Sequence, residues 1–219
     1  VGDNIFITGN VNGGSPTFVP SINTSMAGGD ITLNGTILRD TRNECIISTN
    51  ASGNITITGT STLKAGTNTR SLTLSGGPAS IVTVAIDIVH DGPRSFNDMK
   101  ITGGTVNLKN VGDPVFVGVH GSLTVTSLTN EINLSGTTYF AENQLYTAAA
   151  TKNIVFSSLA SIGVKSADSP ITFATSGGGF VQLSNTGITL TVDSSFGVVA
   201  GGNISMGLVR APGKVMNTL

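Results

Sequence analysis

The chain has 219 residues, of which 38% are hydrophobic and only 11% are charged, and its net charge is −1. A hydrophobic, weakly charged chain of this length is expected to fold into one large domain rather than remain disordered. The balanced charge excludes the basic surface that attracts nucleic acid, and no stretch reaches the roughly 20 apolar residues of a membrane span. We therefore expect no nucleic-acid partner and no membrane-spanning segment here.

Cys45 is the only cysteine. It cannot form an intramolecular disulfide or a cysteine-based metal site, and its apolar neighbours in "NECIIST" indicate a small buried side chain. The sequence begins at Val1 without a methionine. We interpret residues 1–219 as a single domain that is either a mature protein or an excised fragment of a longer one.

Short stretches of alternating apolar and polar residues recur along the whole chain, each rich in Ile, Val and Thr and bounded by Gly, Asn, Ser or Asp. This pattern is typical of β-strands joined by turns. In chain order the stretches are 30–33, 54–59, 71–76, 81–86, 100–110, 121–129, 131–136, 153–158, 169–175, 180–185, 187–193 and 202–207. The fold class expected is therefore all-β. Residues 137–153 are Ala-rich with apolar Phe140, Leu145 and Tyr146, and they form either a short helix or a loop.

One short sequence motif occurs three times, as "GGDITLNG" at 28–35, "SGNITITG" at 52–59 and "GGNISMGL" at 201–208. A parallel β-helix explains the repetition, because equivalent residues of successive coils lie above one another about 4.8 Å apart. On this interpretation Ile31, Ile55 and Ile204 occupy one kind of core position. The preceding glycines would supply a positive φ at the corner of the coil.

The spacing of the repeated apolar residues indicates a coil of about 22 residues, hence roughly ten coils. Ile55 follows Ile31 by one such step, and Ile171 follows Leu123 by two. The last two steps, to Ile188 and then to Ile204, are shorter, so the coil is expected to tighten near its end. The residues predicted to be buried are Ile31, Ile55, Leu74, Leu123, Ile171, Ile188 and Ile204.

Because β-helices also host polysaccharide lyases and hydrolases, the carboxylates of this chain are possible catalytic groups. The twelve acids form no adjacent pair, whereas sugar hydrolysis requires an acid and a base a few ångströms apart. The densest ionisable stretch contains His90, Asp91 and Arg94, and Asp113 follows Asp91 by one coil length. These four are the weak catalytic candidates, and "HDGPR" at 90–94 is also an ordinary solvated turn. No cofactor-binding or metal-ligating residues are expected.

Pairs of threonines with the spacing Thr-x-Thr, as at Thr124/Thr126, are what an ice-binding solenoid would present. Here the pairs do not return once per coil, and threonine is also the usual outward residue of a strand. The sequence therefore does not favour ice binding.

The phrases "GNITITGTSTLKAG", "AGGDITLNGT" and "GSLTVTSLTNEINLSGT" resemble the coils of bacterial surface exoproteins, namely the passenger domains of autotransporter adhesins and filamentous-haemagglutinin-type proteins. The resemblance extends over about 28–136 and 150–207. The chlamydial polymorphic membrane proteins are a narrower similarity, since "FAEN" at 140–143 matches their Phe-x-x-Asn repeat once.

This resemblance implies a right-handed parallel β-helix, export to the bacterial cell surface or the extracellular space, and a role in adhesion or as a stalk. The partners it implies are host-cell or matrix surface molecules or glycans. We therefore expect a non-enzymatic adhesin segment, and the alternative is a carbohydrate-active β-helix enzyme such as a polysaccharide lyase or hydrolase.

Overall fold

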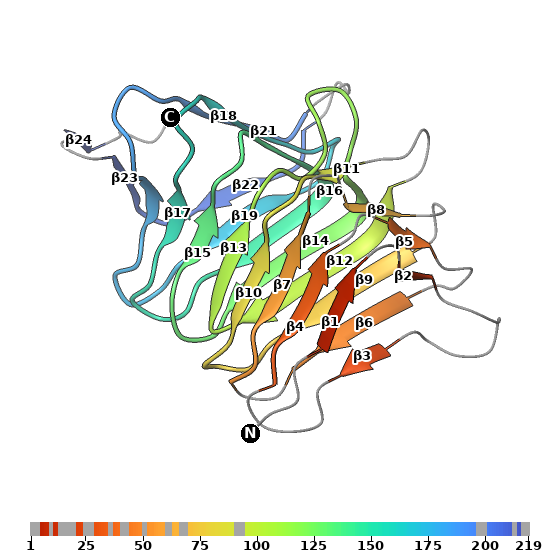
Figure 1. The fold of residues 1–219 in the computed structure, drawn as a ribbon. Helices are drawn as coiled ribbons and strands as arrows, with labels where there is room; N and C mark the ends of the chain where they lie inside the picture. Colours follow the sequence, from red (N-terminus) through yellow and green to blue (C-terminus); the bar gives the residue numbers. More distant parts are fainter. Residues whose placement is uncertain are drawn as a thin grey trace.

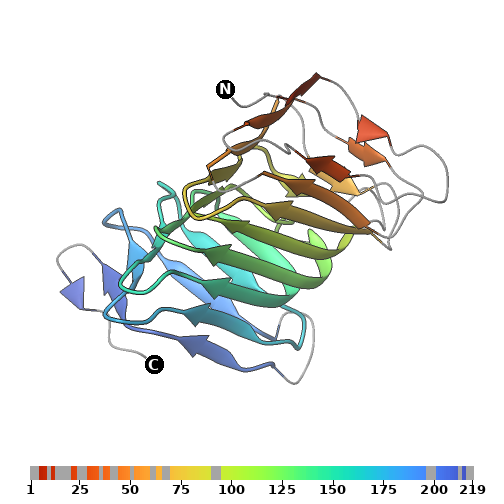
Figure 2. The same ribbon diagram turned by 90° about the horizontal axis from the view of Figure 1, so that it is seen from below.

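The computed structural model describes residues 5–8, 11–12, 21–23, 29–34, 37–39, 44–49, 52–59, 63–65, 70–89, 95–195, 201–211 and 214–215. Regular structure in these residues consists of β-strands alone, as the sequence predicts. Almost every strand pairs in parallel with strands one coil earlier and one coil later, so the fold is a parallel β-solenoid with three faces, A, B and C (Figure 1). Figure 2 shows the strands stacked from the N-terminal to the C-terminal end.

Face A holds the first strand of each coil. Its strands are β1 (Ile5–Thr8), β4 (Ile31–Asn34), β7 (Ile55–Thr58), β10 (Ile81–Val84), β13 (Thr105–Leu108), β15 (Ile132–Leu134), β17 (Ile154–Phe156), β20 (Val181–Leu183), β23 (Val209–Ala211) and β24 (Lys214–Val215). The last pairing, between β23 and β24, is antiparallel.

Face B is formed by short strands, and single bridges from Ile88 to Val111 and from Val111 to Tyr139 continue it between β11 and β16. Its strands are β2 (Val11–Asn12), β5 (Ile37–Arg39), β8 (Leu63–Ala65), β11 (Ile88–Val89), the first part of β16 (Thr138–Thr147), β18 (Ile162–Lys165) and β21 (Leu190–Asp193).

Face C contains the longest strands. They are β3 (Ser21–Asn23), β6 (Glu44–Ser48), β9 (Arg70–Ser75), β12 (Phe96–Gly103), β14 (Val119–Ser127), the second part of β16, β19 (Ile171–Ala174) and β22 (Ile204–Met206). Strand β16 belongs to two faces because it passes a corner: Thr138–Phe140 pair with β18, whereas Gln144–Thr147 pair with β19.

The coil is longer than the sequence spacing predicts. Seven face-A pairings lead from Ile31 to Val209, so the mean step from one coil to the next exceeds the predicted length. The longer step leaves room for fewer than ten coils in this chain. The predicted tightening near the end is also wrong, since the step from Ile171 to its partner Ile204 is longer than the step from Ile31 to Ile55.

The core is built from columns of inward side chains. Alternate residues of a strand point to the same side, and the parallel register places the apolar residues of one strand beside those of the next. One face-A column contains Ile31, Ile55, Val82, Val106, Ile132, Ile154 and Val181, all 0% exposed. Burying each such side chain stabilises the fold by about 1.5–3 kcal/mol. Cys45 is buried in the core, as predicted.

Five of the seven residues predicted to be buried are completely buried, and they come from two faces: Ile31, Ile55, Leu74, Leu123 and Ile171. Ile188 is only partly buried. Ile204 is 46% exposed, which contradicts the prediction. The reason is its place in β22, which within the described residues pairs with β19 alone, so no further coil covers that end of the column.

The three copies of the repeated motif lie in two different positions of the solenoid. Ile31 and Ile55 are direct partners on face A, as predicted, but Ile204 is the partner of Ile171 on face C. Positive φ does not explain the preceding glycine, because neither Gly53 nor Gly202 has one. A Cβ atom on Gly53 would instead lie 2.1 Å from the carbonyl oxygen of Gly29. Glycine is therefore required there because neighbouring coils approach closely at the turn.

Residues 137–153 form neither the short helix nor the loop that the sequence predicts. Most of them form β16, where Gln144 and Tyr146 are buried and Leu145 between them is 37% exposed. This alternation has the period of a strand. The partners β14 and β19 on either side of β16 therefore override the helical preference of the alanines.

Candidate functional site

The four predicted catalytic candidates are only partly placed by the structure. His90, Asp91 and Arg94 lie outside the described residues, whereas Asp113 lies within them. Asp113 itself stands in the loop that connects β13 to β14, on the side of face B.

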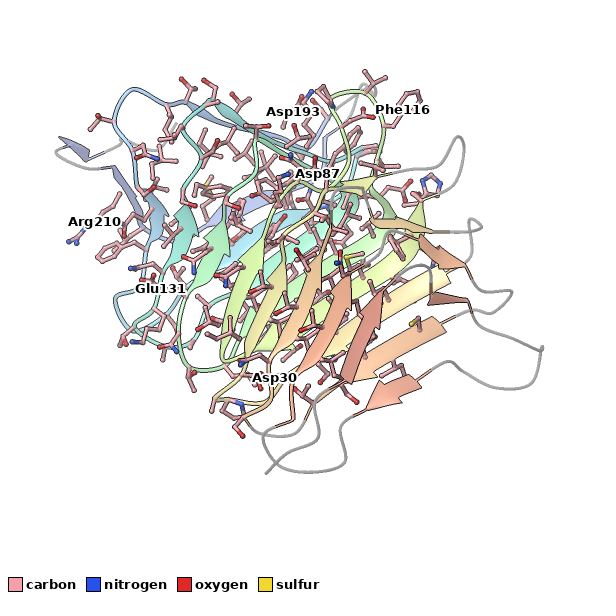
Figure 3. The ribbon with its side chains drawn as sticks, viewed as in Figure 1. Asp30, Asp87, Phe116, Glu131, Asp193 and Arg210 are labelled. Atoms are coloured by element: carbon pink, nitrogen blue, oxygen red, sulfur yellow. The ribbon has the colours of Figure 1, made fainter. Side chains whose placement is uncertain are left out.

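The Asp113 carboxylate organises its own loop. Its Oδ1 atom accepts hydrogen bonds from the backbone N–H groups of Val115, at 2.7 Å, and Phe116, at 2.8 Å. The Lys165 ammonium adds a bond to the carbonyl oxygen of Pro114, which ties the loop to β18. The side chains of Val115 and Phe116 remain exposed, and Figure 3 shows Phe116 at the edge of the molecule. An aspartate that bonds the two following amides is a turn-forming residue.

Two other aspartates bond the backbone of the next coil. The Oδ1 atom of Asp30 accepts the backbone N–H of Asn54 at 2.7 Å, and Asn54 Oδ1 accepts that of Ile81 at 2.8 Å. On face C, Asp98 Oδ1 accepts the backbone N–H of Ser122 at 2.9 Å. These side chains satisfy amides at strand entries and join consecutive coils.

Amide side chains extend the same system at two corners. Asn110 donates to Asp87 Oδ1 at 3.0 Å, and its own Oδ1 accepts the backbone N–H of Thr137 at 2.7 Å. Asn153 donates to Glu131 Oε1 at 2.9 Å and accepts the backbone N–H of Phe180. Figure 3 shows that Asp30, Asp87, Glu131 and Asp193 lie at separate places on the solenoid.

His120 and Glu142 are neighbours on successive coils, with Nδ1 and Oε1 3.2 Å apart. Both side chains are well exposed, so solvent screens the pair and it contributes little to stability. Among the described residues, no group of three or more His, Cys, Asp or Glu side chains could hold a metal ion.

A polar network within the described part of the core is centred on Gln144, which is 0% exposed and lies between Leu123 and Ile171 in a face-C column. Its Nε2 donates to the carbonyl oxygens of Ala141 and Lys165, and its Oε1 accepts the Tyr146 hydroxyl at 2.8 Å. These bonds satisfy the buried amide at the corner of β16.

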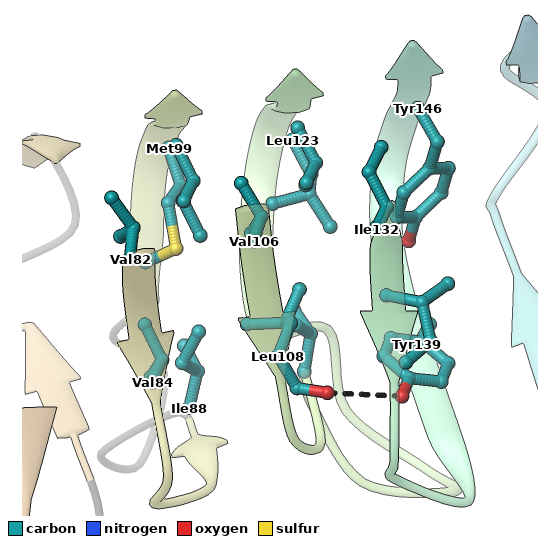
Figure 4. Close-up of a cluster of buried hydrophobic side chains, with 14 of the residues drawn as sticks. Val82, Val84, Ile88, Met99, Val106, Leu108, Leu123, Ile132, Tyr139 and Tyr146 are labelled. Carbon is teal, nitrogen blue, oxygen red and sulfur yellow. Dashed lines mark hydrogen bonds between the residues drawn. The ribbon is translucent and has the colours of Figure 1, made fainter. Parts of the chain in front are cut away.

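Two buried tyrosines stand beside this corner. The Tyr139 hydroxyl accepts the backbone N–H of Gly136 at 2.7 Å and donates to the carbonyl oxygen of Leu108 at 3.4 Å (Figure 4). Tyr146 stacks on Phe173 with ring centroids 5.1 Å apart. Burial in the apolar core raises the pKa of both tyrosines well above the ordinary value of 10.

These shifts predict a loss of stability in alkali. The folded state keeps both phenolic protons while the unfolded chain releases them above pH 10, so the free energy of unfolding is unaffected below pH 10 and falls above it. The slope is about 1.4 kcal/mol per pH unit for each tyrosine. Urea unfolding between pH 8 and 11.5 measures it. The double variant Tyr139→Phe/Tyr146→Phe should have a shallower slope, and an equal slope would contradict the assignment.

The side chains that join the coils at the corners, above all Asn54, Asn110 and Asn153, were not predicted from the sequence. Their signature in the sequence is an Asn, Asp or Glu next to a strand. The hydrogen-bond partner of this residue lies next to another strand, about one coil length away in the chain. Asn54 follows Asp30 by 24 residues and Asn153 follows Glu131 by 22. The motif at 28–35 and 52–59 contained part of this signature in Asp30 and Asn54.

Comparisons of the chain with protein-family models, with curated proteins and with solved structures found no match. Among the described residues, the structure has no helix with the length and apolarity needed to cross a membrane.

Proposed function

We propose that the chain is a non-enzymatic, extracellular β-helix of right-handed winding, a segment of a bacterial surface adhesin or autotransporter passenger that mediates adhesion or acts as a stalk. Its partners on this proposal are surface molecules or glycans of a host cell or matrix. The parallel solenoid is the architecture that the resemblance implies. Right-handed winding is supported by the strong preference of parallel strand connections for that hand.

One observation carries the non-enzymatic part of the proposal, namely the use of carboxylates as structural hydrogen-bond acceptors. Asp30 and Asp98 bond backbone amides of the next coil, and Asp113 bonds those of its own turn. Asp87 bonds Asn110 and also lies 3.2 Å from the Lys109 ammonium. A catalytic acid or base must instead reach its substrate from a shared site with a second group.

The direct test is a screen of the purified protein against pectin, polygalacturonate, alginate and glycosaminoglycans, with and without calcium. We expect no turnover, together with binding to host cells or matrix glycans that survives His90→Ala. Turnover that disappears in a His90→Ala or Asp91→Ala variant would establish the alternative, a carbohydrate-active enzyme. Asp30→Asn is the matched control for these two variants. Asp30 is also a carboxylate, but it bonds the backbone of the neighbouring coil and is not one of the catalytic candidates.

A further inference from the structure

The outer surface of face C carries columns of hydroxyl groups that no single stretch of sequence reveals. Outward residues of successive strands are direct register partners, and they give two columns. The first contains Ile46, Thr73, Lys100, Thr124, Leu145, Thr172 and Ser205, and the second contains Ser48, Ser75, Thr102, Thr126 and Thr147. The second column is an uninterrupted run of hydroxyls across five strands, from β6 to β16.

Three polar residues on face A behave differently. Their side chains bond one another along one outward column: Asn133 donates to Asn107 at 2.9 Å, and Asn107 donates to Thr83 at 3.1 Å. On face C, no side-chain hydrogen bond within the described residues engages Thr102, Thr126 or Thr147. Their donors and acceptors are therefore available to solvent or to a ligand.

The array has a regular spacing. Neighbouring strands of a sheet lie about 4.8 Å apart, and alternate residues along a strand are about 6.6 Å apart. The strands β9, β12, β14, β16 and β19 lie side by side across this face (Figure 1). Inside the two columns the only charge among the described residues is Lys100. The two columns thus form a lattice that consists mostly of uncharged hydroxyls, many of which also carry a methyl group.

We propose that face C binds ice through this lattice. A hydroxyl both donates and accepts, as water does, and ice presents its water molecules in a regular planar array. A rigid solenoid holds the hydroxyls in place before contact, so many weak hydrogen bonds form together without a further loss of side-chain freedom. The two columns are uncharged apart from Lys100, and this composition suits a neutral lattice. The inference does not depend on the proposed adhesin function.

The experiment is an ice-recrystallisation assay on the purified chain, supported by thermal hysteresis. We expect the protein to suppress crystal growth and Thr126→Tyr to abolish the effect, because a ring in the uninterrupted column lifts the lattice away from ice. Thr56→Tyr is the matched control, since Thr56 is an outward threonine on face A. It should keep full activity, with circular dichroism confirming that both variants fold.

A second variant tests the same lattice in the opposite direction. Lys100→Thr/Leu145→Thr replaces the charged residue and the leucine that interrupt the first column between β9 and β19, so it should increase suppression of crystal growth. The proposal is overturned if the unmodified chain does not affect ice growth, or if Thr126→Tyr and Thr56→Tyr behave alike. Binding of insoluble neutral polysaccharide through face C without any effect on ice would also overturn it.

Discussion

An Ile55→Asp variant is expected to lose several kcal/mol of folding free energy and to be largely unfolded at 37 °C. Ile55 is 0% exposed and lies in the face-A column between Ile31 and Val82, its partners on the coils before and after. A carboxylate at this position would be buried among aliphatic side chains without a partner, which is among the most destabilising of single changes. Urea unfolding followed by circular dichroism measures the effect.

The matched control is Thr56→Asp, one residue further along the same strand but on its outward side. It should change the free energy of unfolding by less than about 1 kcal/mol, because the new charge is hydrated. Ile55→Val is a milder inward variant for the case that Ile55→Asp does not fold, and it should cost about 1 kcal/mol. Equal losses in Ile55→Asp and Thr56→Asp would contradict the assigned faces of β7.

A Gly53→Ala variant is expected to cost about 3 kcal/mol although it adds only one methyl group. A Cβ atom at this position would lie 2.1 Å from the carbonyl oxygen of Gly29 and 2.9 Å from Cβ of Thr49. The first of these contacts is with backbone of the preceding coil, which cannot rotate away. The turn must therefore shift, and the Thr49 hydroxyl bond to the carbonyl oxygen of Gly53, 2.6 Å long, is disturbed with it.

Gly163→Ala provides the comparison, because the nearest atom to its Cβ would be Cε of Lys165 at 3.7 Å, an ordinary contact. Its φ is not positive, so alanine fits and should stabilise the fold by about 0.5 kcal/mol through the unfolded chain. Thermal or urea unfolding of the two variants would contradict the account if both substitutions had the same sign and size.

The sequence predicts the fold class and much of the core because period-2 alternation directly reports which side of a strand is buried. Ile31 and Ile55 show this, since they are partners on face A, one coil apart, as predicted. Sequence spacing cannot distinguish one face from another, however. Ile204 belongs to the same sequence motif but lies on face C, where its column ends. Similarity of sequence therefore gave a wrong prediction of burial.

The coil length and β16 were wrongly predicted for a related reason. Turn lengths vary from coil to coil, so an average spacing measured between residues of different faces underestimates the step. In β16, Gln144 occupies a core position. Apolar residues occupy the equivalent positions in the neighbouring strands, namely Leu123 in β14 and Ile171 in β19. The suitability of Gln144 depends on carbonyl groups of Ala141 and Lys165, which only the corner of the folded chain brings within reach.

Of the candidate site, the sequence could predict the ionisable residues but not their roles. The role of Asp113 depends on the amides of its own turn, and the role of Asp30 depends on an amide of the next coil. The hydroxyl columns of face C were hidden for the same reason: Thr102 and Thr147 belong to no Thr-x-Thr pair and meet Thr126 only through the register.

The central claim is that successive coils stack in the register described, and a distance between two spin labels tests it most directly. Outward residues Thr56 and Gln182, which are far apart in the chain, lie five face-A strand spacings apart along one column. Five spacings of about 4.8 Å predict a backbone separation of about 24 Å. Pulsed electron paramagnetic resonance on the doubly labelled protein should give a single narrow distribution consistent with this value. A broad distribution, or one centred far from it, would contradict the stacked solenoid.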